Sequence, residues 1–157
     1  MTDQPSVVLQ LEAVNTVPGP ISPVRPTLYL QCDDGRFSAY ITTGAVLDED
    51  QPARDAGFPN MTFVRVRWGS GRATLEEWER STDYGAAFAP APVDFLKQLL
   101  AIPDLRFEFH PFDAAPRVAI FNARALDRHI PKVKAACPIL RRPTQREWLR
   151  QRDSQPQ

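Results

Sequence analysis

The sequence has few of the side chains on which catalysis and metal binding usually depend. Its 157 residues include only two histidines and two cysteines, and no CxxC pair, which excludes a zinc knuckle and a thioredoxin-type motif. A phosphate-binding loop is also absent, because Gly69-Ser70-Gly71 is followed by Arg72 and not by Lys and Ser or Thr. We therefore predict no catalytic residues, no metal site and no cofactor.

Long apolar runs and a net charge are missing as well. No stretch approaches the roughly 20 apolar residues of a membrane-spanning helix, so no membrane span is expected. The 19 Lys and Arg residues balance the 19 Asp and Glu residues, and this neutrality does not favour a nucleic-acid partner. Residues 1–6 lack the basic and apolar parts of a signal peptide. Taken literally, the sequence predicts a cytoplasmic protein, although a trimmed exported protein would look the same.

Proline is abundant, with 16 residues, about twice the usual share of roughly 5%, and this favours strands and loops. Alternating apolar and polar residues predict strands at 7–14, 27–32, 36–43, 61–68, 73–80, 105–109 and 117–122. Asp33-Asp34-Gly35 predicts a hairpin turn. With no βαβ alternation, the order indicates an α+β fold: a mainly antiparallel sheet or sandwich-like domain of about seven strands.

Helical periodicity appears twice. An apolar stripe over residues 90–102 predicts one helix packed on the sheet, and a second stripe from Leu126 to Cys137 predicts a short C-terminal helix that begins near Pro131. Residues 1–140 are expected to form a single β-rich domain, and residues 141–157 a basic, flexible tail.

Two other segments are expected to be irregular. Residues 44–60 are polar and acidic, which predicts a solvated loop. The three-residue spacing of Leu75 and Trp78 predicts a bulge or an irregular segment in their strand.

Candidate binding residues lie on the strand 61–68 and in the tail. Arg65 and Arg67 share one strand face and are suited to hold a carboxylate-bearing partner. The simpler interpretation is cross-strand pairing with Glu76 or Glu79. Trp148, among the arginines of the tail, is suited to act as an anchor that becomes ordered on binding.

The two cysteines, Cys32 and Cys137, allow two interpretations. They are either buried reduced thiols that act as small apolar side chains, or a disulfide formed outside the cytoplasm. The residues themselves leave both open.

Several short segments, taken in order, resemble one bacterial family. They are Leu28-Tyr-Leu-Gln-Cys32, Val64-Arg-Val-Arg67, Trp78 with Ser81-Thr-Asp83, Ala86-Ala-Phe88, and Ala119-Ile-Phe121 before Cys137. Over residues 27–138 this order resembles the VasI or TagO type of accessory protein associated with type VI secretion. The resemblance implies an accessory or binding domain, export to the periplasm when the N-terminus is trimmed, and pairing of Cys32 with Cys137.

We therefore predict a non-catalytic accessory or binding domain that acts through protein–protein contacts, with a secretion or envelope component as partner. One alternative is a small hydrolase or cell-wall-modifying enzyme, which requires His110 or His129 beside an acid such as Asp83 or Asp113. The other is an immunity or inhibitor protein, with the acidic loop 48–55 blocking the partner's active site.

Overall fold

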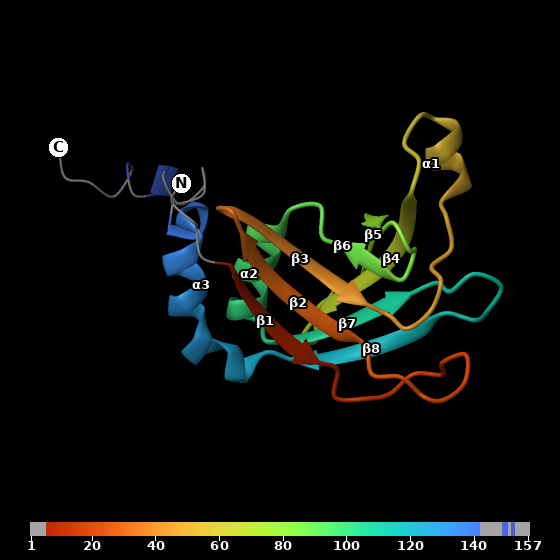
Figure 1. The fold of residues 1–157 in the computed structure, drawn as a ribbon, viewed down its shortest axis with the longest axis horizontal. Helices are drawn as coiled ribbons and strands as arrows, with labels where there is room; N and C mark the ends of the chain where they lie inside the picture. Colours follow the sequence, from red (N-terminus) through yellow and green to blue (C-terminus); the bar gives the residue numbers. More distant parts are fainter. Residues whose placement is uncertain (1–5, 142–148, 151, 153–157) are drawn as a thin grey trace.

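A computed structural model describes residues 6–141, 149, 150 and 152. In this part of the chain, eight strands form one antiparallel sheet in the order β1-β2-β3-β6-β5-β4-β7-β8 (Figure 1). The strands are β1 (Val7–Glu12), β2 (Thr27–Asp33), β3 (Arg36–Thr42), β4 (Met61–Trp68), β5 (Thr74–Arg80), β6 (Ala86–Phe88), β7 (Asp104–Phe109) and β8 (Arg117–Asn122). The helices are α1 (Gln51–Asp55), α2 (Pro92–Ala101) and α3 (Ile130–Ala136), with 3-10 turns η1 (Arg124–His129) and η2 (Pro138–Arg141).

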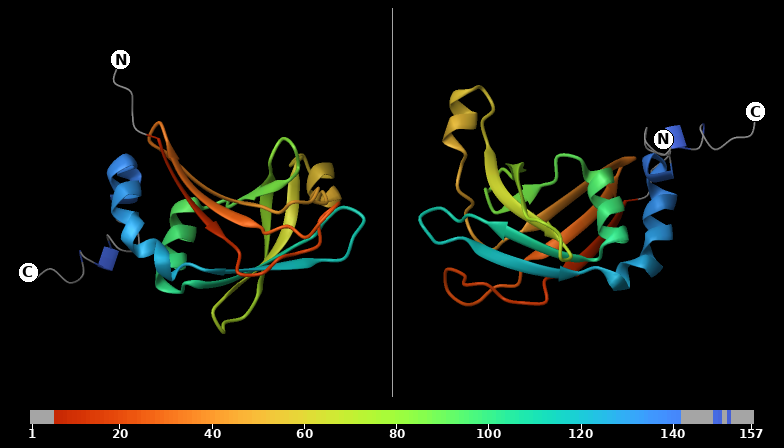
Figure 2. Two further views of the ribbon diagram at one scale, coloured as in Figure 1. Left: turned by 60° about the horizontal axis from the view of Figure 1, so that its bottom comes forward. Right: turned by 180° about the vertical axis from the view of Figure 1, so that it is seen from behind.

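The sheet curls until its two edge strands nearly meet (Figures 1 and 2). Just beyond β1, the Val14 N–H donates to the Ile120 carbonyl at 2.7 Å. The Asn15 side chain donates to the Val118 carbonyl and accepts from the Ile120 N–H, both at 2.8 Å. Asn15 thus satisfies backbone groups of β8 that would otherwise form an open edge. The result is a nearly closed barrel, with α2 and α3 at one end and α1 at the other (Figure 1).

The antiparallel α+β arrangement predicted from the sequence is confirmed, in its single-sheet form. The strand number is eight instead of about seven, because Ala86–Phe88 pairs with both β3 and β5. The turn of the β2–β3 hairpin is confirmed, with positive φ at Asp34 (50°) and Gly35 (74°). The predicted bulge in β5 is wrong: the β4–β5 register is unbroken, and Leu75 lies on the outer face with 58% of its surface exposed.

The inside of the barrel is a packed aromatic core. The ring centroid of Trp78 lies 5.5 Å from that of Phe95 in α2, edge-on, and 5.1 Å from that of Phe107 in β7. Trp68 contacts Phe95 from the other side at 5.3 Å. Since Phe95 of α2 contacts both Trp68 and Trp78 of the sheet, side chains fill the interior at this end of the barrel.

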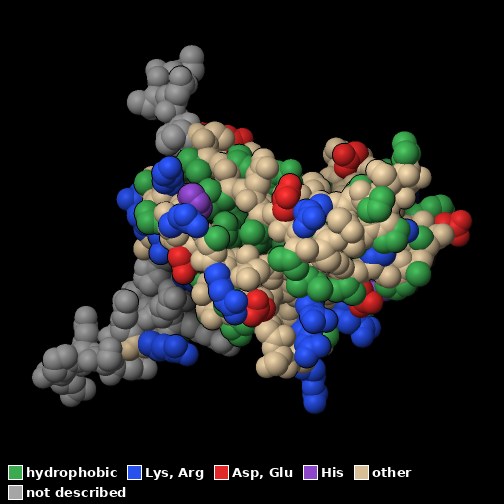
Figure 3. Space-filling model, turned by 90° about the horizontal axis from the view of Figure 1, so that it is seen from below, with side chains coloured by type: hydrophobic (Ala, Val, Ile, Leu, Met, Phe, Trp, Pro, Cys, Tyr) green, Lys and Arg blue, Asp and Glu red, His purple; other side chains and the backbone are tan. Residues whose placement is uncertain are grey.

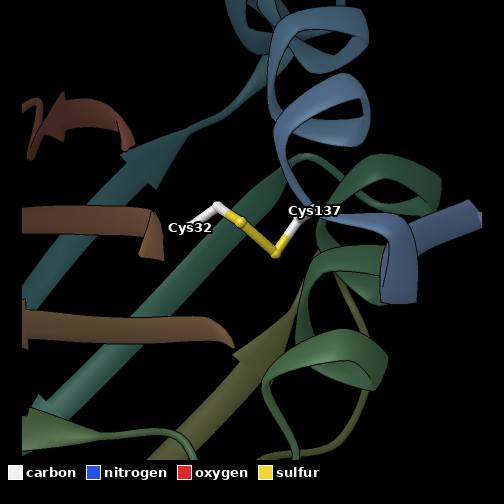
Figure 4. The surroundings of a disulfide bond; sticks show 2 residues. All are labelled: Cys32 and Cys137. Carbon is white, nitrogen blue, oxygen red and sulfur yellow. A yellow bond between two sulfur atoms is a disulfide. The ribbon is translucent and has the colours of Figure 1, made fainter. Parts of the chain in front are cut away.

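A disulfide joins Cys32 of β2 to Cys137 at the end of α3, with a Cα–Cα distance of 5.8 Å (Figure 4). Both residues are fully buried. The structure therefore selects the pairing that the family resemblance implied over the reduced thiols. The bond holds α3 against β1 and β2, where Ile130 and Val133 are buried.

The predicted terminal helix is confirmed as η1 and α3, and α3 begins at Ile130, next to Pro131. The predicted tail is barely covered: Trp148 and most of residues 141–157 lie outside the described residues. Among the helices of the described part, none is long and apolar enough to cross a membrane.

Candidate functional site

The end of the barrel near α1 carries exposed apolar side chains on several loops. We call this surface the loop end and define it by Val46, Phe58, Tyr84 and Phe112. Their exposed fractions are 55%, 68%, 45% and 68%. Soluble proteins rarely leave large apolar groups together in the solvent without a use for them.

These loops are braced against one another by backbone hydrogen bonds. The Phe112 N–H donates to the Val46 carbonyl at 2.7 Å, and the Leu47 N–H donates to the Tyr84 carbonyl at 2.8 Å. Leu47 and Pro111 also form an isolated antiparallel bridge. The loops that carry Val46, Tyr84 and Phe112 are therefore joined to one another, whereas the Phe58 N–H donates to the Ala53 carbonyl of α1 at 2.8 Å.

The Glu49 carboxylate connects several segments of the same region through hydrogen bonds and ion pairs, and we call this set of contacts the Glu49 brace. Its carboxylate accepts hydrogen bonds from Arg54 at 2.8 Å, Arg80 at 2.9 Å and the Asn60 N–H at 3.1 Å. Arg80 also donates to the Leu47 carbonyl at 3.1 Å, and its guanidinium carbon lies 4.2 Å from the ring centroid of Tyr84. The brace thus connects α1, β5 and two of the loops.

The expectation of a solvated acidic loop at 44–60 is corrected by this brace and by α1. Asp50 is only 5% exposed and caps α1 by accepting from the Ala53 N–H at 3.2 Å. Glu49 is bound by two guanidiniums. Two of the acids that would have formed an inhibitory plug are therefore used inside the fold.

The Glu49 brace predicts a pH-dependent stability. The pKa of Glu49 lies below its ordinary value of 4.5, first because Arg54 donates a hydrogen bond to the carboxylate and further because of the Asn60 N–H and the charges of Arg54 and Arg80, against opposing desolvation. Since the folded chain binds this proton more weakly than the unfolded chain, the carboxylate stabilises the fold above the unfolded pKa, which is the ordinary value of 4.5. That contribution is lost as the pH falls through the lower folded value.

Glu49→Gln is accordingly expected to lower the melting temperature at neutral pH, with a difference from the parent that shrinks as the pH falls from about 5 to 3. Thermal melts across this range measure it. Glu79→Gln, at an exposed position of β5, is the matched control. If the difference in melting temperature between the Glu49→Gln variant and the parent protein stayed constant with pH, the lowered pKa of Glu49 would be refuted.

A cavity of about 210 Å³ opens where β4 and the end of β7 diverge. Residues 47–50 fill the gap: the Asp48 N–H donates to the His110 carbonyl and the Asp50 N–H to the Met61 carbonyl, both at 2.8 Å. The cavity is lined by Asp48, Glu49, Asp50, Thr62, Phe63, Arg65, Leu75 and His110. We call it the acidic pocket.

The structure places Arg65 and Arg67 on the outer face of β4, as the alternation predicted. Their expected pairing with Glu76 or Glu79 is wrong. Arg65 faces Leu75 on β5, and its Nε lies 3.3 Å from Glu108 on β7.

Arg67 lies opposite Arg106, and neither forms an ion pair within the described residues. Basic side chains also gather at the lower edge of the face drawn in Figure 3. Binding of a carboxylate-bearing partner by Arg65 and Arg67 stays a prediction.

The two histidines lie at opposite ends of the fold. His110 follows β7, whereas η1, which contains His129, is joined to the start of β7 by an Arg124–Asp104 ion pair of 3.2 Å. Six residues of strand separate these ends by about 20 Å. The acids that line a pocket together with His110 are Asp48, Glu49 and Asp50.

No hydrogen bond joins His110 to an acid among the described side chains, and its Nε2 is buried without a partner. In the same part of the chain, no group of three or more His, Cys, Asp or Glu is placed to hold a metal ion. Comparison with protein-family models, curated proteins and solved structures gives no match.

Proposed function

We propose that this chain is a non-catalytic binding domain that acts through protein–protein contacts at the loop end. The observation that carries the proposal is the exposure of Phe58 and Phe112, each 68%, on loops that hydrogen bonds hold in place. Aromatic side chains are enriched at protein interfaces and often dominate their binding energy. Because hydrogen bonds already hold these loops in place, the loops lose less conformational entropy when a partner binds.

For the partner, we propose a component of a bacterial secretion system or of the cell envelope. The order of short motifs that resembles VasI or TagO-type proteins supports this class. The Cys32–Cys137 disulfide supports an oxidising compartment such as the periplasm, because disulfides persist there and are rare in the cytosol.

A pair of matched variants tests the loop end. Phe58→Ser with Phe112→Ser removes the two most exposed rings of this surface, and Ile21→Ser removes an apolar side chain that is 99% exposed on the β1–β2 loop. The purified proteins are immobilised and exposed to an envelope extract, and the bound proteins are quantified by mass spectrometry. A specific partner is expected to fall about tenfold or more with the double Phe variant, since each buried aromatic anchor contributes strongly to affinity.

The control decides between specific and general adhesion. The Ile21→Ser variant should retain the partner at the level of the parent protein. If both variants lose the same proteins, or if neither loses any, the loop end is not the contact surface. Circular dichroism of the variants checks that the disulfide-linked fold is intact.

A further inference from the structure

We infer that the acidic pocket binds a primary ammonium group carried on a short aliphatic chain, such as the lysine side chain of a protein partner. The inference deepens the proposed function, because Asp48 and His110 each lie two residues from a loop-end residue, Val46 and Phe112. The pocket itself consists of other side chains, so it can be tested separately.

The charge of the pocket favours a cation. Asp48 and Asp50 line it, and neither forms an ion pair within the described residues, whereas Glu49 between them is bound by Arg54 and Arg80. Arg65, the one cation of the lining, is paired with Glu108 at 3.3 Å. Two carboxylates therefore lack a positive partner at this position.

A third carboxyl group adds to this field. The pKa of Glu77 is raised, first by desolvation and then by the charge of Asp50. Its neighbour Asp50 is only 5% exposed. A bound cation at this position would relieve the repulsion between these carboxyl groups.

Two polar atoms of the pocket lack a hydrogen-bond partner. Thr62 is 1% exposed and its hydroxyl oxygen bonds to nothing in the described structure. The Nε2 atom of His110 is also buried and has no hydrogen-bond partner among the described residues. Buried polar groups without partners are rare in folded proteins, so these two atoms indicate a site that a polar ligand completes.

An ammonium group matches these acceptors. It offers three N–H donors and no acceptor, and the carboxylates of Asp48 and Asp50 line the pocket. Thr62 also lines it, and its hydroxyl is a buried acceptor on the inner face of β4. Phe63 and Leu75 form an apolar wall for the chain that carries the nitrogen. The volume of about 210 Å³ is well above the roughly 10–15 Å³ that one water needs on the same measure, so a short aliphatic ammonium ion has room to enter.

Titration with n-butylammonium chloride, followed by NMR of the intact disulfide-bonded protein, tests the inference. Saturable shifts are expected at backbone amides of residues 48–50, 62–65 and 110. n-Butyltrimethylammonium has the same charge but no N–H donor, and is expected to bind at least about tenfold more weakly, since a charge-assisted hydrogen bond is lost. Sodium chloride keeps the ionic strength constant.

Two substitutions probe the acceptors without disturbing the fold. Asp50→Asn removes the charge but keeps an N-cap residue of similar strength for α1, and Thr62→Val removes the hydroxyl at similar volume. Asp50→Asn is expected to weaken binding about tenfold or more, and Thr62→Val several-fold. Asp55→Asn, an exposed acid of α1, is the control and should leave affinity unchanged.

The outcomes separate this inference from the proposed function. Shifts that never saturate, equal binding of both ammonium compounds, or equal losses for Asp50→Asn and Asp55→Asn would overturn the ammonium site and show a hydrated pocket only. Saturable butylammonium binding with no effect of the Phe58 and Phe112 substitutions on partner capture would leave the pocket standing and refute the loop end. The reverse pattern would keep the loop end and remove the pocket.

Discussion

Replacing both Cys32 and Cys137 with alanine is expected to lower the free energy of unfolding by roughly 4–5 kcal/mol, because the disulfide restricts the unfolded chain most when it closes a long loop. The two cysteines are separated by 105 residues. For a domain of this size each kcal/mol corresponds to about 2–4 °C in melting temperature, so a decrease on the order of 10 °C or more is expected. The same bond holds α3 on β1 and β2, so hydrogen exchange of residues 130–137 should accelerate first.

Thermal or urea melts with and without a reductant measure this effect. The parent protein is expected to lose stability on reduction, and the double alanine variant is expected to be insensitive to the reductant. Equal midpoints for the oxidised and reduced parent would refute a stabilising role of the bond. A reductant effect that persists in the double variant would mean that reduction acts elsewhere.

The secondary structure was predictable wherever the local pattern was strong. The alternation from Met61 to Trp68 separates an apolar from a polar face, and the structure has that strand with those faces. The turn at Asp34 and Gly35 has the positive φ that its residue types favour. By contrast, β6 has three residues and α1 has five, and neither is long enough to show a period.

Leu75 shows why one strand was misread. An apolar residue was expected to face the core, so its three-residue spacing from Trp78 indicated a bulge. In the sheet, Leu75 lies on the outer face beside Phe63 and Arg65, where it lines the acidic pocket. The pattern of apolar and polar residues does not show that an apolar side chain such as Leu75 lies on the outer face.

The candidate site depends on the order of strands in the sheet, which no local pattern contains. Arg65 was expected to pair with the next strand of its hairpin, but β4 has a second neighbour, β7, that the chain reaches only after α2. The acidic pocket likewise joins residues 48–50 to residue 110 through this arrangement. The one signal available was the pair of acids, Asp48 and Asp50, in a segment between strands.

The largest effect expected from a single substitution in the core is at Trp78, which is 1% exposed. Its ring contacts Phe95 and Phe107, and its Nε1–H donates to Glu76 at 3.1 Å. Trp78→Ala is expected to cost about 3–5 kcal/mol, the range for removal of a buried aromatic side chain that leaves a cavity. Urea unfolding of the oxidised protein measures this loss.

Two further variants on β5 locate the cause of that loss. Trp78→Phe keeps an aromatic ring beside Phe95 but gives up volume and the bond to Glu76, so its cost should fall well below that of Trp78→Ala. Leu75→Ala removes an apolar side chain that is 58% exposed on the same strand, and it should change stability by at most about 0.5 kcal/mol, as surface substitutions usually do. If Leu75→Ala cost as much as Trp78→Ala, Leu75 would be a buried residue, and the assignment of the faces of β5 would be wrong. The conclusion that binding takes place on the outer surface, because the interior is packed, would then be lost as well.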